Sequence, residues 1–316
     1  MAHASYILIS FLLVVVLNVA KGQPLVPALF IFGDSVVDVG NNNDLYTIVK
    51  ANFPPYGRDF SNHSSTGRFC NGKLATDYTA ENLGFTSYPP AYLNLNVKGR
   101  NLLNGANFAS AASGYYDPTA QLYVNIYLQH TIPLSQQLKH YKESQDILVG
   151  IVGQSNASSI VSGAIHLNLY ALGARRIGVT TLPPMGCLPA AVTLFGSGSN
   201  ECVVRLNTDA VNFNKKLNTT SQSLQNSLSG LKLVILDIYQ PLYDLVTKPS
   251  ENGFFEARKA CCGTGLLETS ILCNKESIGT CVNASEYVFW DGFHPSEAAN
   301  KVLSGELLAA GISLIS

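Results

Sequence analysis

Charged side chains are scarce in this chain. Asp, Glu, Lys and Arg make up 13% of its 316 residues, and the formal net charge is −1. Nucleic-acid-binding proteins carry a basic excess, so this composition argues against a nucleic-acid partner. No charge run or low-complexity tract suggests a disordered arm. Because 47% of the residues are hydrophobic, the chain can bury a substantial core.

Metal-binding patterns are also missing from the sequence. The seven cysteines lack the paired Cys-x-x-Cys spacing and the nearby histidines of a zinc site. An oxidising compartment would instead pair most of them. Cys187 and Cys202 flank one loop and are expected partners, while Cys70 is left as the odd thiol. Four further cysteines allow three pairings, of which the bond between adjacent residues is disfavoured by strain: Cys261, Cys262, Cys273 and Cys281.

The amino terminus is an uncharged apolar run over residues 6–20. Small residues at the spacing for cleavage before Gln23 predict that residues 1–22 are a secretory signal peptide. The run is shorter than the ~20 residues that span a bilayer, which disfavours an anchoring helix and any stable membrane insertion after cleavage. Four Asn-x-Ser/Thr sequons agree with export to the cell exterior and are candidate glycosylation sites: Asn62, Asn156, Asn218 and Asn283.

Short apolar runs alternate with longer amphipathic segments in the remaining chain. The expected strands are residues 28–32, 106–109, 176–181 and 233–239. The expected helices are residues 74–83, 134–149, 203–228 and 296–310. This alternation predicts a parallel sheet covered on both faces, with ligands bound beyond the carboxyl ends of the strands. No linker divides residues 23–316, so we expect a single domain.

A serine follows Gly-Asp at the end of the first expected strand, in "ALFIFGDSVVDVGNNND". Turns after strands are rich in Gly, Asp and Ser for conformational reasons alone, so on this segment Ser35 is either a nucleophile or a turn residue. A nucleophilic serine needs a base to take its proton and a third group to orient that base.

The candidate base lies near the carboxyl terminus, in "YVFWDGFHPSEAANKVL". Asp291 precedes His294 by three residues, a spacing that lets the carboxylate reach Nδ1 while Nε2 faces outward. Pro295 holds His294 in extended backbone at the entrance of the last helix. The alternative is that His294 is a helix-entry residue and Asp291 an ordinary turn residue.

With both segments present, the chain resembles the plant GDSL-type esterase/lipase family of the SGNH hydrolases. The matching segments occur in family order and cover nearly all of the mature chain: "FIFGDSVVDVGNNN", "FPPYGRDF", "STGRFCNGKLATDY", "NFASAASGYYD", "LGARRIGVTTLPPMGCLPA", "CCGTG" and "YVFWDGFHPSEAAN". The resemblance implies a flavodoxin-like three-layer α/β/α fold with a mostly parallel sheet. It also implies hydrolysis of carboxylic esters, lipids among them, without a metal or organic cofactor.

The same resemblance assigns roles to individual residues. Ser35 would be the nucleophile, His294 the general base and then the general acid, and Asp291 the group that orients His294. The oxyanion hole would use the backbone N–H groups of Ser35 and Gly114. The alternative for Gly114 is a turn glycine kept for its backbone freedom.

The sequence departs from the family pattern between residues 162 and 176. The family has a strand that ends in a Gly-x-Asn-Asp block, whose Asn amide points at the developing oxyanion. A parallel crossover needs at least about a dozen residues, and too few remain here for both a strand and its helix. We therefore expect a missing or truncated central strand, unless residues 164–169 fill the gap. The lost donor would weaken catalysis, and three other side chains are candidate replacements: Asn42, Asn43 and Asn107.

Together these features predict a secreted serine esterase or lipase that acts on small-molecule acyl esters through a Ser-His-Asp triad and an acyl-enzyme. The missing block keeps two alternatives open. One is a secreted binding remnant of the family with weak or no catalysis. The other is an acyltransferase, which would pass the acyl group to an alcohol other than water.

Overall fold

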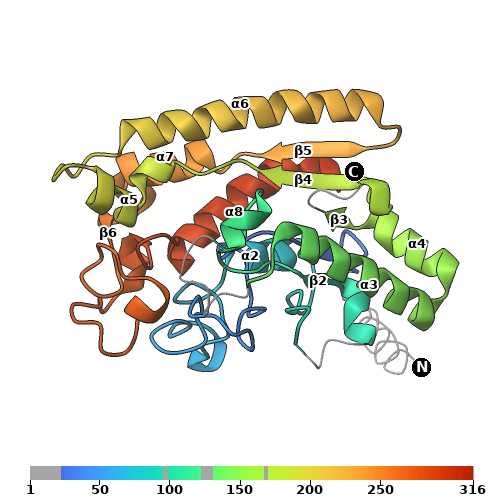
Figure 1. Cartoon of the computed structure of the whole chain (residues 1–316), viewed down its shortest axis with the longest axis horizontal. Coiled ribbons are helices and arrows are strands. Elements are labelled where there is room, and N and C mark those ends of the chain that lie inside the picture. The colour runs from blue at the N-terminus through green and yellow to red at the C-terminus, as the bar shows by residue number, and fades with distance from the viewer. Residues whose placement is uncertain (1–22, 95–98, 122–130, 167–169, 316) are drawn as a thin grey trace, which may run out of the picture.

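A five-stranded parallel sheet forms the centre of the molecule (Figure 1). The computed structural model describes residues 23–94, 99–121, 131–166 and 170–315, so the predicted signal peptide lies outside the described residues. Within them the strand order is β2-β1-β3-β4-β5, and every pairing is parallel. The strands are β1 (Leu29–Ile31), β2 (Gly105–Asn107), β3 (Ile165–His166), β4 (Arg176–Thr180) and β5 (Lys232–Leu236).

Helices pack against both faces of this sheet. Those that cover it are α2 (Ala75–Asn82), α3 (Leu134–Val152), α4 (Gln154–Gly163), α6 (Val204–Ser227) and α8 (Glu297–Gly311). Because side chains alternate along a strand, Phe30 points to one face, where its ring lies 5.2 Å from that of Tyr141 in α3. Leu29 and Ile31 point to the other face and pack against α2 and the residue that ends it, Leu83. Helix α8 packs beside α2 and against β5.

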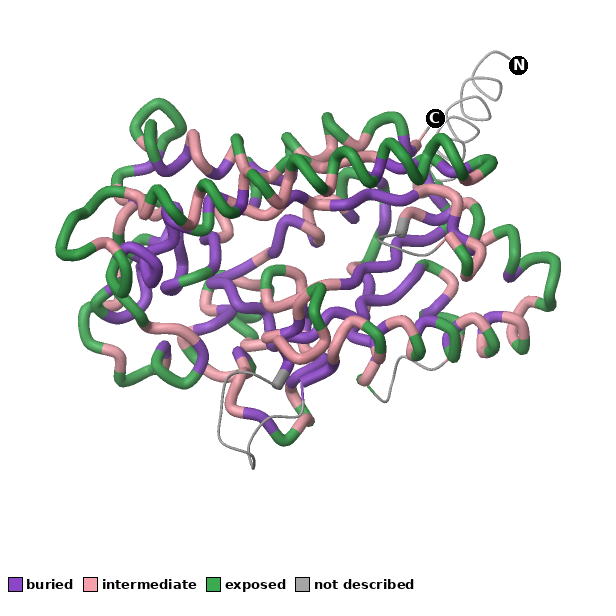
Figure 2. The backbone as a smooth tube through the Cα atoms, turned by 45° about the horizontal axis from the view of Figure 1, so that its top comes forward, coloured by how far each residue is buried: buried purple, intermediate pink, exposed green. Residues whose placement is uncertain are grey.

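The predicted elements of the sheet region are confirmed. Each of the four expected strands overlaps an observed strand, and each of the four expected helices an observed helix. In Figure 2 the buried residues follow the strands and the exposed residues follow the outer sides of the helices. The spacing of apolar residues in the sequence therefore indicated these elements. No helix within the described residues is both long and apolar enough to cross a membrane.

The central strand is not missing but short, and it lies within residues 164–169, the segment expected to fill the gap if any did. Strand β3 lies between β1 and β4, with Ile165 paired to both Leu29 and Arg176. What is missing among the described residues is a crossover helix, because only a single 3₁₀ turn, Tyr170–Leu172, separates β3 from β4. The Arg175 guanidinium lies over the Tyr170 ring at 4.2 Å, and Tyr170 donates to the carbonyl of Ser229 at 2.9 Å. These contacts anchor the short connection.

A second, smaller sheet was not predicted from the sequence. It pairs β6 (Glu256–Ala260) with β7 (Tyr287–Phe289) in parallel, beside α5 (Pro189–Phe195) and α7 (Tyr239–Thr247). These elements gather at the left of Figure 1, and their buried side chains share one apolar cluster with α8. The chain leaves β7 directly into the segment that contains Asp291 and His294.

Three disulfides fasten this part of the molecule. Cys187 is bonded to Cys202, as expected from the loop that they flank. The other four cysteines form Cys261–Cys281 and Cys262–Cys273, so the strained adjacent pairing is avoided. Cys70 is a buried free thiol.

Candidate active site

The structure brings Ser35, His294 and Asp291 together. Ser35 Oγ lies 2.7 Å from His294 Nε2, across 259 residues of sequence. His294 Nδ1 lies 2.6 Å from Asp291 Oδ1. Asp291 is fully buried and His294 is only 5% exposed. These distances are within hydrogen-bond reach, so the hydroxyl can pass its proton to the imidazole.

The turn after β7 fixes the imidazole. Asp291 Oδ1 also accepts hydrogen bonds from the backbone N–H groups of Phe293 at 2.9 Å and His294 at 3.0 Å. The carbonyl of His294 in turn accepts from Trp290 N at 2.8 Å. Because a carboxylate can only accept, the proton on the ring is assigned to Nδ1, which leaves Nε2 to accept from the Ser35 hydroxyl.

Two residues that the sequence did not reveal complete the surroundings of Asp291. Its Oδ2 accepts from the Tyr56 hydroxyl at 2.7 Å and from the Thr269 hydroxyl at 3.1 Å. Tyr56 is almost fully buried, and its oxygen accepts from Ser270 N at 2.8 Å. Burial and the neighbouring Asp291 charge raise the pKa of Tyr56 well above its usual value, so this phenol remains a neutral donor.

Aromatic rings close the inner side of the imidazole. The Phe69 ring lies 5.0 Å from the His294 ring and 5.7 Å from the Tyr56 ring. The Trp290 ring lies 6.3 Å from Tyr56 and is fully buried. This wall excludes water from the Asp291 side of the imidazole, where a competing hydrogen bond would disturb its orientation.

The loop that carries Ser35 is tied to the loop after β2. Asp38 Oδ1 accepts from the N–H groups of Gly40 and Asn41 at 2.8 Å, and Oδ2 accepts from Ala111 N at 2.9 Å. Asn41 donates to the carbonyls of Asn107 at 2.9 Å and Ala109 at 2.7 Å. Burial raises the pKa of Asp38 to about 6, against the opposing effect of these backbone hydrogen bonds.

Gln137 of α3 makes a second bridge between the same two loops. Its Oε1 accepts from Gly33 N at 3.0 Å, and its Nε2 donates to the Gly33 carbonyl at 2.8 Å and to Ser113 Oγ at 3.1 Å. Ser113 directly precedes Gly114 and Gly33 lies two residues before Ser35, so one buried amide fixes the backbone close to both candidate oxyanion donors. Among the described residues, the N–H groups of Ser35 and Gly114 donate to no acceptor.

Gly114 does not have a positive φ, so its backbone conformation is not the left-handed one that favours glycine. A Cβ built at this position would lie 3.1 Å from Thr119 Cγ2. A larger residue here would therefore be crowded by the Thr119 side chain.

The asparagines suggested as replacement oxyanion donors are occupied elsewhere. Both amide hydrogens of Asn42 are used, on the carbonyls of Val49 at 2.9 Å and Ala111 at 3.1 Å. Asn107 donates to the Val37 carbonyl at 2.6 Å, and Asn43 donates to the Thr66 carbonyl at 2.9 Å. All three hold loops together, and Asn42 has no donor left for an oxyanion.

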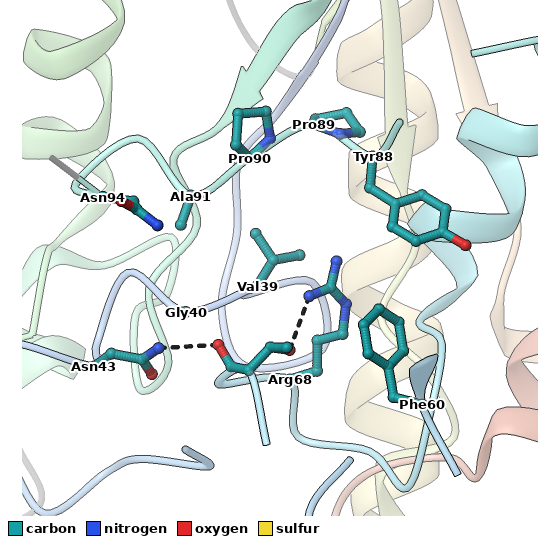
Figure 3. Close-up of a pocket in the computed structure, with 11 residues that line it drawn as sticks. Val39, Gly40, Asn43, Phe60, Arg68, Tyr88, Pro89, Pro90, Ala91 and Asn94 are labelled. Carbon is teal, nitrogen blue, oxygen red and sulfur yellow. Dashed lines mark hydrogen bonds between the residues drawn. The ribbon is translucent and has the colours of Figure 1, made fainter. Parts of the chain in front are cut away.

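Asn43 lines a pocket of about 320 Å³ that contains none of the triad residues (Figure 3). Arg68 extends into it beside Phe60 and Tyr88, with its Cζ atom 4.7 Å and 5.7 Å from the two ring centroids. The same guanidinium forms a buried bidentate ion pair with Asp77, at 2.8 Å for both bonds. The pocket is therefore built around a structural ion pair.

The other candidate positions lie at the surface. The four sequon asparagines, Asn62, Asn156, Asn218 and Asn283, are all exposed, as a glycan acceptor must be. Asn156 and Asn218 lie in α-helices. No group of three or more His, Cys, Asp or Glu side chains within the described residues is placed to hold a metal ion.

Several known proteins are similar to this chain over nearly their whole lengths. GDSL esterase/lipase At5g22810 of Arabidopsis thaliana is 61% identical over 345 aligned positions, which cover 96% of this chain and 94% of the relative. From the same plant, GDSL esterase/lipase At5g03820 is 58% identical and GDSL esterase/lipase APG is 54% identical, with 95% of each chain covered. The first alignment is longer than the 316 residues of this chain, so that relative contains residues without a counterpart here.

The sequence profile of the family described as GDSL-like Lipase/Acylhydrolase matches residues 29–307. This span begins at β1, ends within α8 and includes Ser35, Asp291 and His294. The family match thus covers the same residues that the fold brings together. The chain belongs to the GDSL-like lipase/acylhydrolase family and is a serine hydrolase of ester bonds.

Proposed function

We propose that this protein hydrolyses acyl esters with Ser35 as nucleophile, His294 as general base and Asp291 as the group that orients His294. The observation that carries the proposal is the unbroken path from Ser35 Oγ to His294 Nε2 at 2.7 Å and from His294 Nδ1 to Asp291 Oδ1 at 2.6 Å. Such a path activates a serine that is otherwise a weak nucleophile.

In the first half-reaction, Ser35 Oγ attacks the ester carbonyl carbon while its proton moves to His294 Nε2. The carbonyl oxygen becomes an oxyanion, which we assign to the N–H groups of Ser35 and Gly114. The tetrahedral intermediate then expels the alcohol, which takes its proton from the His294 imidazolium. Asp291 stabilises the imidazolium while it exists. The product of this half is an acyl ester of Ser35.

In the second half-reaction, His294 takes a proton from water, and the resulting hydroxide attacks the acyl carbonyl. Collapse of this intermediate releases the acid and returns the proton to Ser35 Oγ. If an alcohol replaced water, the same acyl-enzyme would give acyl transfer, so product analysis with a competing alcohol tests that alternative. No step needs a cofactor.

The shortened connection after β3 bears on the rate of these steps. We infer that the residues present in At5g22810 but lacking here include the family's Gly-x-Asn-Asp block, between Gly163 and Tyr170. The observation in favour is that β3 passes into β4 through a 3₁₀ turn, without a helix in the described residues. Without the Asn amide the oxyanion has one donor fewer, and such a loss slows turnover by about 10²–10³-fold.

We further infer that residues 23–316 form one domain of the flavodoxin-like three-layer type, secreted after removal of residues 1–22. The helices on both faces of the parallel sheet support that fold. Three disulfides support an oxidising compartment. Exposed sequons support glycosylation, and treatment of the secreted protein with an N-glycosidase tests it by a loss of mass.

The central test measures p-nitrophenyl butyrate hydrolysis by the secreted protein and by its Ser35→Ala variant. We expect the variant to lose nearly all turnover. Equal rates would refute the Ser35 mechanism.

A non-catalytic remnant is the second candidate, favoured by the shortened connection after β3. A fluorophosphonate probe separates the two, because it labels only an activated serine. Folded wild-type protein that stays unlabelled would favour the remnant.

A further inference from the structure

Three segments near the triad carry almost no charge. They are residues 185–199, 261–267 and 288–296. With their cysteines in disulfides, their only ionisable side chains are Asp291 and His294, and both are buried. Charges of both signs lie only at their border, where Glu268 follows Leu267 and exposed Lys259 lies beside Gly265.

The three segments meet at Gly292, between the two triad residues of the turn. Ala190 N of α5 donates to the Gly292 carbonyl at 3.0 Å, and Gly292 N donates to the Glu268 carbonyl at 2.8 Å. A second link joins α5 to the disulfide-bonded loop, since Thr193 Oγ1 donates to the Leu266 carbonyl at 3.3 Å. The three segments therefore form one continuous surface beside the triad.

Large apolar side chains protrude from this surface. We call them the apolar rim, and they are Leu194 (58% exposed), Phe195 (55%), Leu266 (40%), Leu267 (37%) and Phe293 (41%). Single exposed apolar residues are common on proteins, but a group of them on connected segments marks an interaction site. Phe293 directly precedes His294, so the rim reaches the catalytic base.

The loop that presents Leu266 and Leu267 is held rigidly. Glu268 accepts from Thr264 N at 2.8 Å, from Thr264 Oγ1 at 2.6 Å, and from the N–H groups of Leu266 and Leu267 at 3.0 and 3.1 Å. Partial burial alone would raise the pKa of Glu268, but these bonds lower it to about 2. The carboxylate is therefore ionised and bonded, and the Cys262–Cys273 bond spans the same loop. The loop therefore loses little conformational entropy when it binds.

We propose that the apolar rim docks the enzyme on an uncharged lipid–water surface, which places Ser35 at the edge of that surface. The inference rests on the proposed esterase function for its purpose. A neutral surface fits because the segments themselves contain no Lys or Arg for anionic headgroups, and the charges at their border, Lys259 and Glu268, have opposite signs. Apolar side chains on a rigid loop gain affinity by leaving water.

The test uses the Ser35→Ala protein, so that binding is measured without turnover. Co-flotation with phosphatidylcholine vesicles compares the Leu266→Gln/Leu267→Gln double variant with Leu224→Gln. Leu224 is a matched control because it is also 40% exposed and lies near the end of α6 that is remote from α5 (Figure 1). We expect the rim variant to partition into the vesicle fraction at least tenfold less than the control. The control should float to the same extent as its parent at low and at high salt.

Three outcomes would overturn the proposal. The first is no flotation of the parent protein, and the second is equal flotation of both variants. The third is that light scattering finds the parent as a dimer and the rim variant as a monomer. The last would make the rim an interface between two copies. If the double variant has a lower melting temperature than its parent, Leu194→Gln on α5 repeats the test at an independent position.

Turnover separates this inference from the proposed function. Here the variants keep Ser35. The ratio of activity on emulsified tributyrin to activity on dissolved p-nitrophenyl butyrate should fall about tenfold in the rim variant. In Leu224→Gln this ratio should not change. If neither substrate is hydrolysed, the proposed function fails, while the flotation result still decides the docking surface.

Discussion

The turn after β7 and the connection after β3 both follow a short parallel strand, yet they are built in opposite ways. The Asp291 carboxylate accepts five hydrogen bonds, from donors that include Tyr56 and Thr269 in remote loops. In the connection after β3, the described residues form one 3₁₀ turn before β4, with Arg175 stacked on Tyr170. The triad therefore depends on loops far from the sheet's middle. The short connection after β3 leaves the triad geometry in place.

The largest effect should come from breaking the densely bonded turn at its centre. Asp291→Asn puts an amide where Oδ1 accepts from the imidazole and two backbone N–H groups. The wrong tautomer of His294 then faces Ser35, and kcat should fall by about 10⁴-fold, as for the equivalent change in serine proteases. Steady-state kinetics on p-nitrophenyl butyrate measure it.

The matched control is Asp237→Asn, just beyond β5. Asp237 also accepts bonds in a turn, from Thr181 Oγ1 at 2.8 Å and Tyr239 N at 3.0 Å, but it is not bonded to the triad. A similar loss of kcat in both variants would mean that Asp291 acts only through folding.

Lengthening the connection after β3 should have the next largest effect. We expect that grafting the corresponding segment of At5g22810 between Gly163 and Tyr170 raises kcat by about 10²–10³-fold, because it returns an oxyanion donor. The control is the same graft with its block asparagine changed to alanine, which should restore the chain length without the rate. If both grafts gave the same rate, the gain would come from the sheet and not from a donor.

The sequence predicted this fold best where burial is strong and local. Strands such as β1 are short apolar runs followed by turn residues, and their positions were visible. The spacing of Asp291 and His294 was visible as well, because one turn joins them. Strand β6, Glu256–Ala260, was missed because charged residues interrupt it and its partner β7 follows far along the chain.

The middle of the sheet was predicted less sharply, with residues 164–169 named only as an alternative to a missing strand. Strand β3 has two residues, Ile165 and His166, and a run that short has no periodicity to detect. Its place is fixed by pairing with β1 and β4 on either side. Tyr56 was missed because its partner Asp291 is 235 residues away, although its segment, "FPPYGRDF", was among those that carried the family resemblance.

Tyr56 provides a finer test of how remote loops support the triad. Tyr56→Phe removes one hydrogen bond to Asp291 Oδ2 and leaves the weaker one from Thr269 at 3.1 Å. A bond to a charged group contributes about 1.5–3 kcal/mol, so kcat should fall by at least about tenfold if the bond strengthens in the transition state. KM should not change, because Tyr56 is buried behind the imidazole.

The comparison variant is Tyr78→Phe, since Tyr78 also donates to a carboxylate, that of Glu297, at 3.3 Å. It should leave kcat unchanged. A loss of thermal stability in Tyr56→Phe without any change in kcat would assign Tyr56 to folding alone.

The smallest expected effect concerns Asp38, which ties the Ser35 loop to the loop after β2. Burial raises its pKa to about 6, above the value of about 3.9 in an unfolded chain. Between these values the folded state binds the proton more readily, so this group's contribution to stability decreases as pH rises from about 4 to about 6. Asp38→Asn cannot titrate. The stability advantage of wild type over Asp38→Asn should therefore shrink by about 2 kcal/mol between pH 4.5 and pH 7, measured by urea unfolding. A difference that is constant with pH would mean that the hydrogen bonds from Gly40, Asn41 and Ala111 fully offset the burial of the carboxylate.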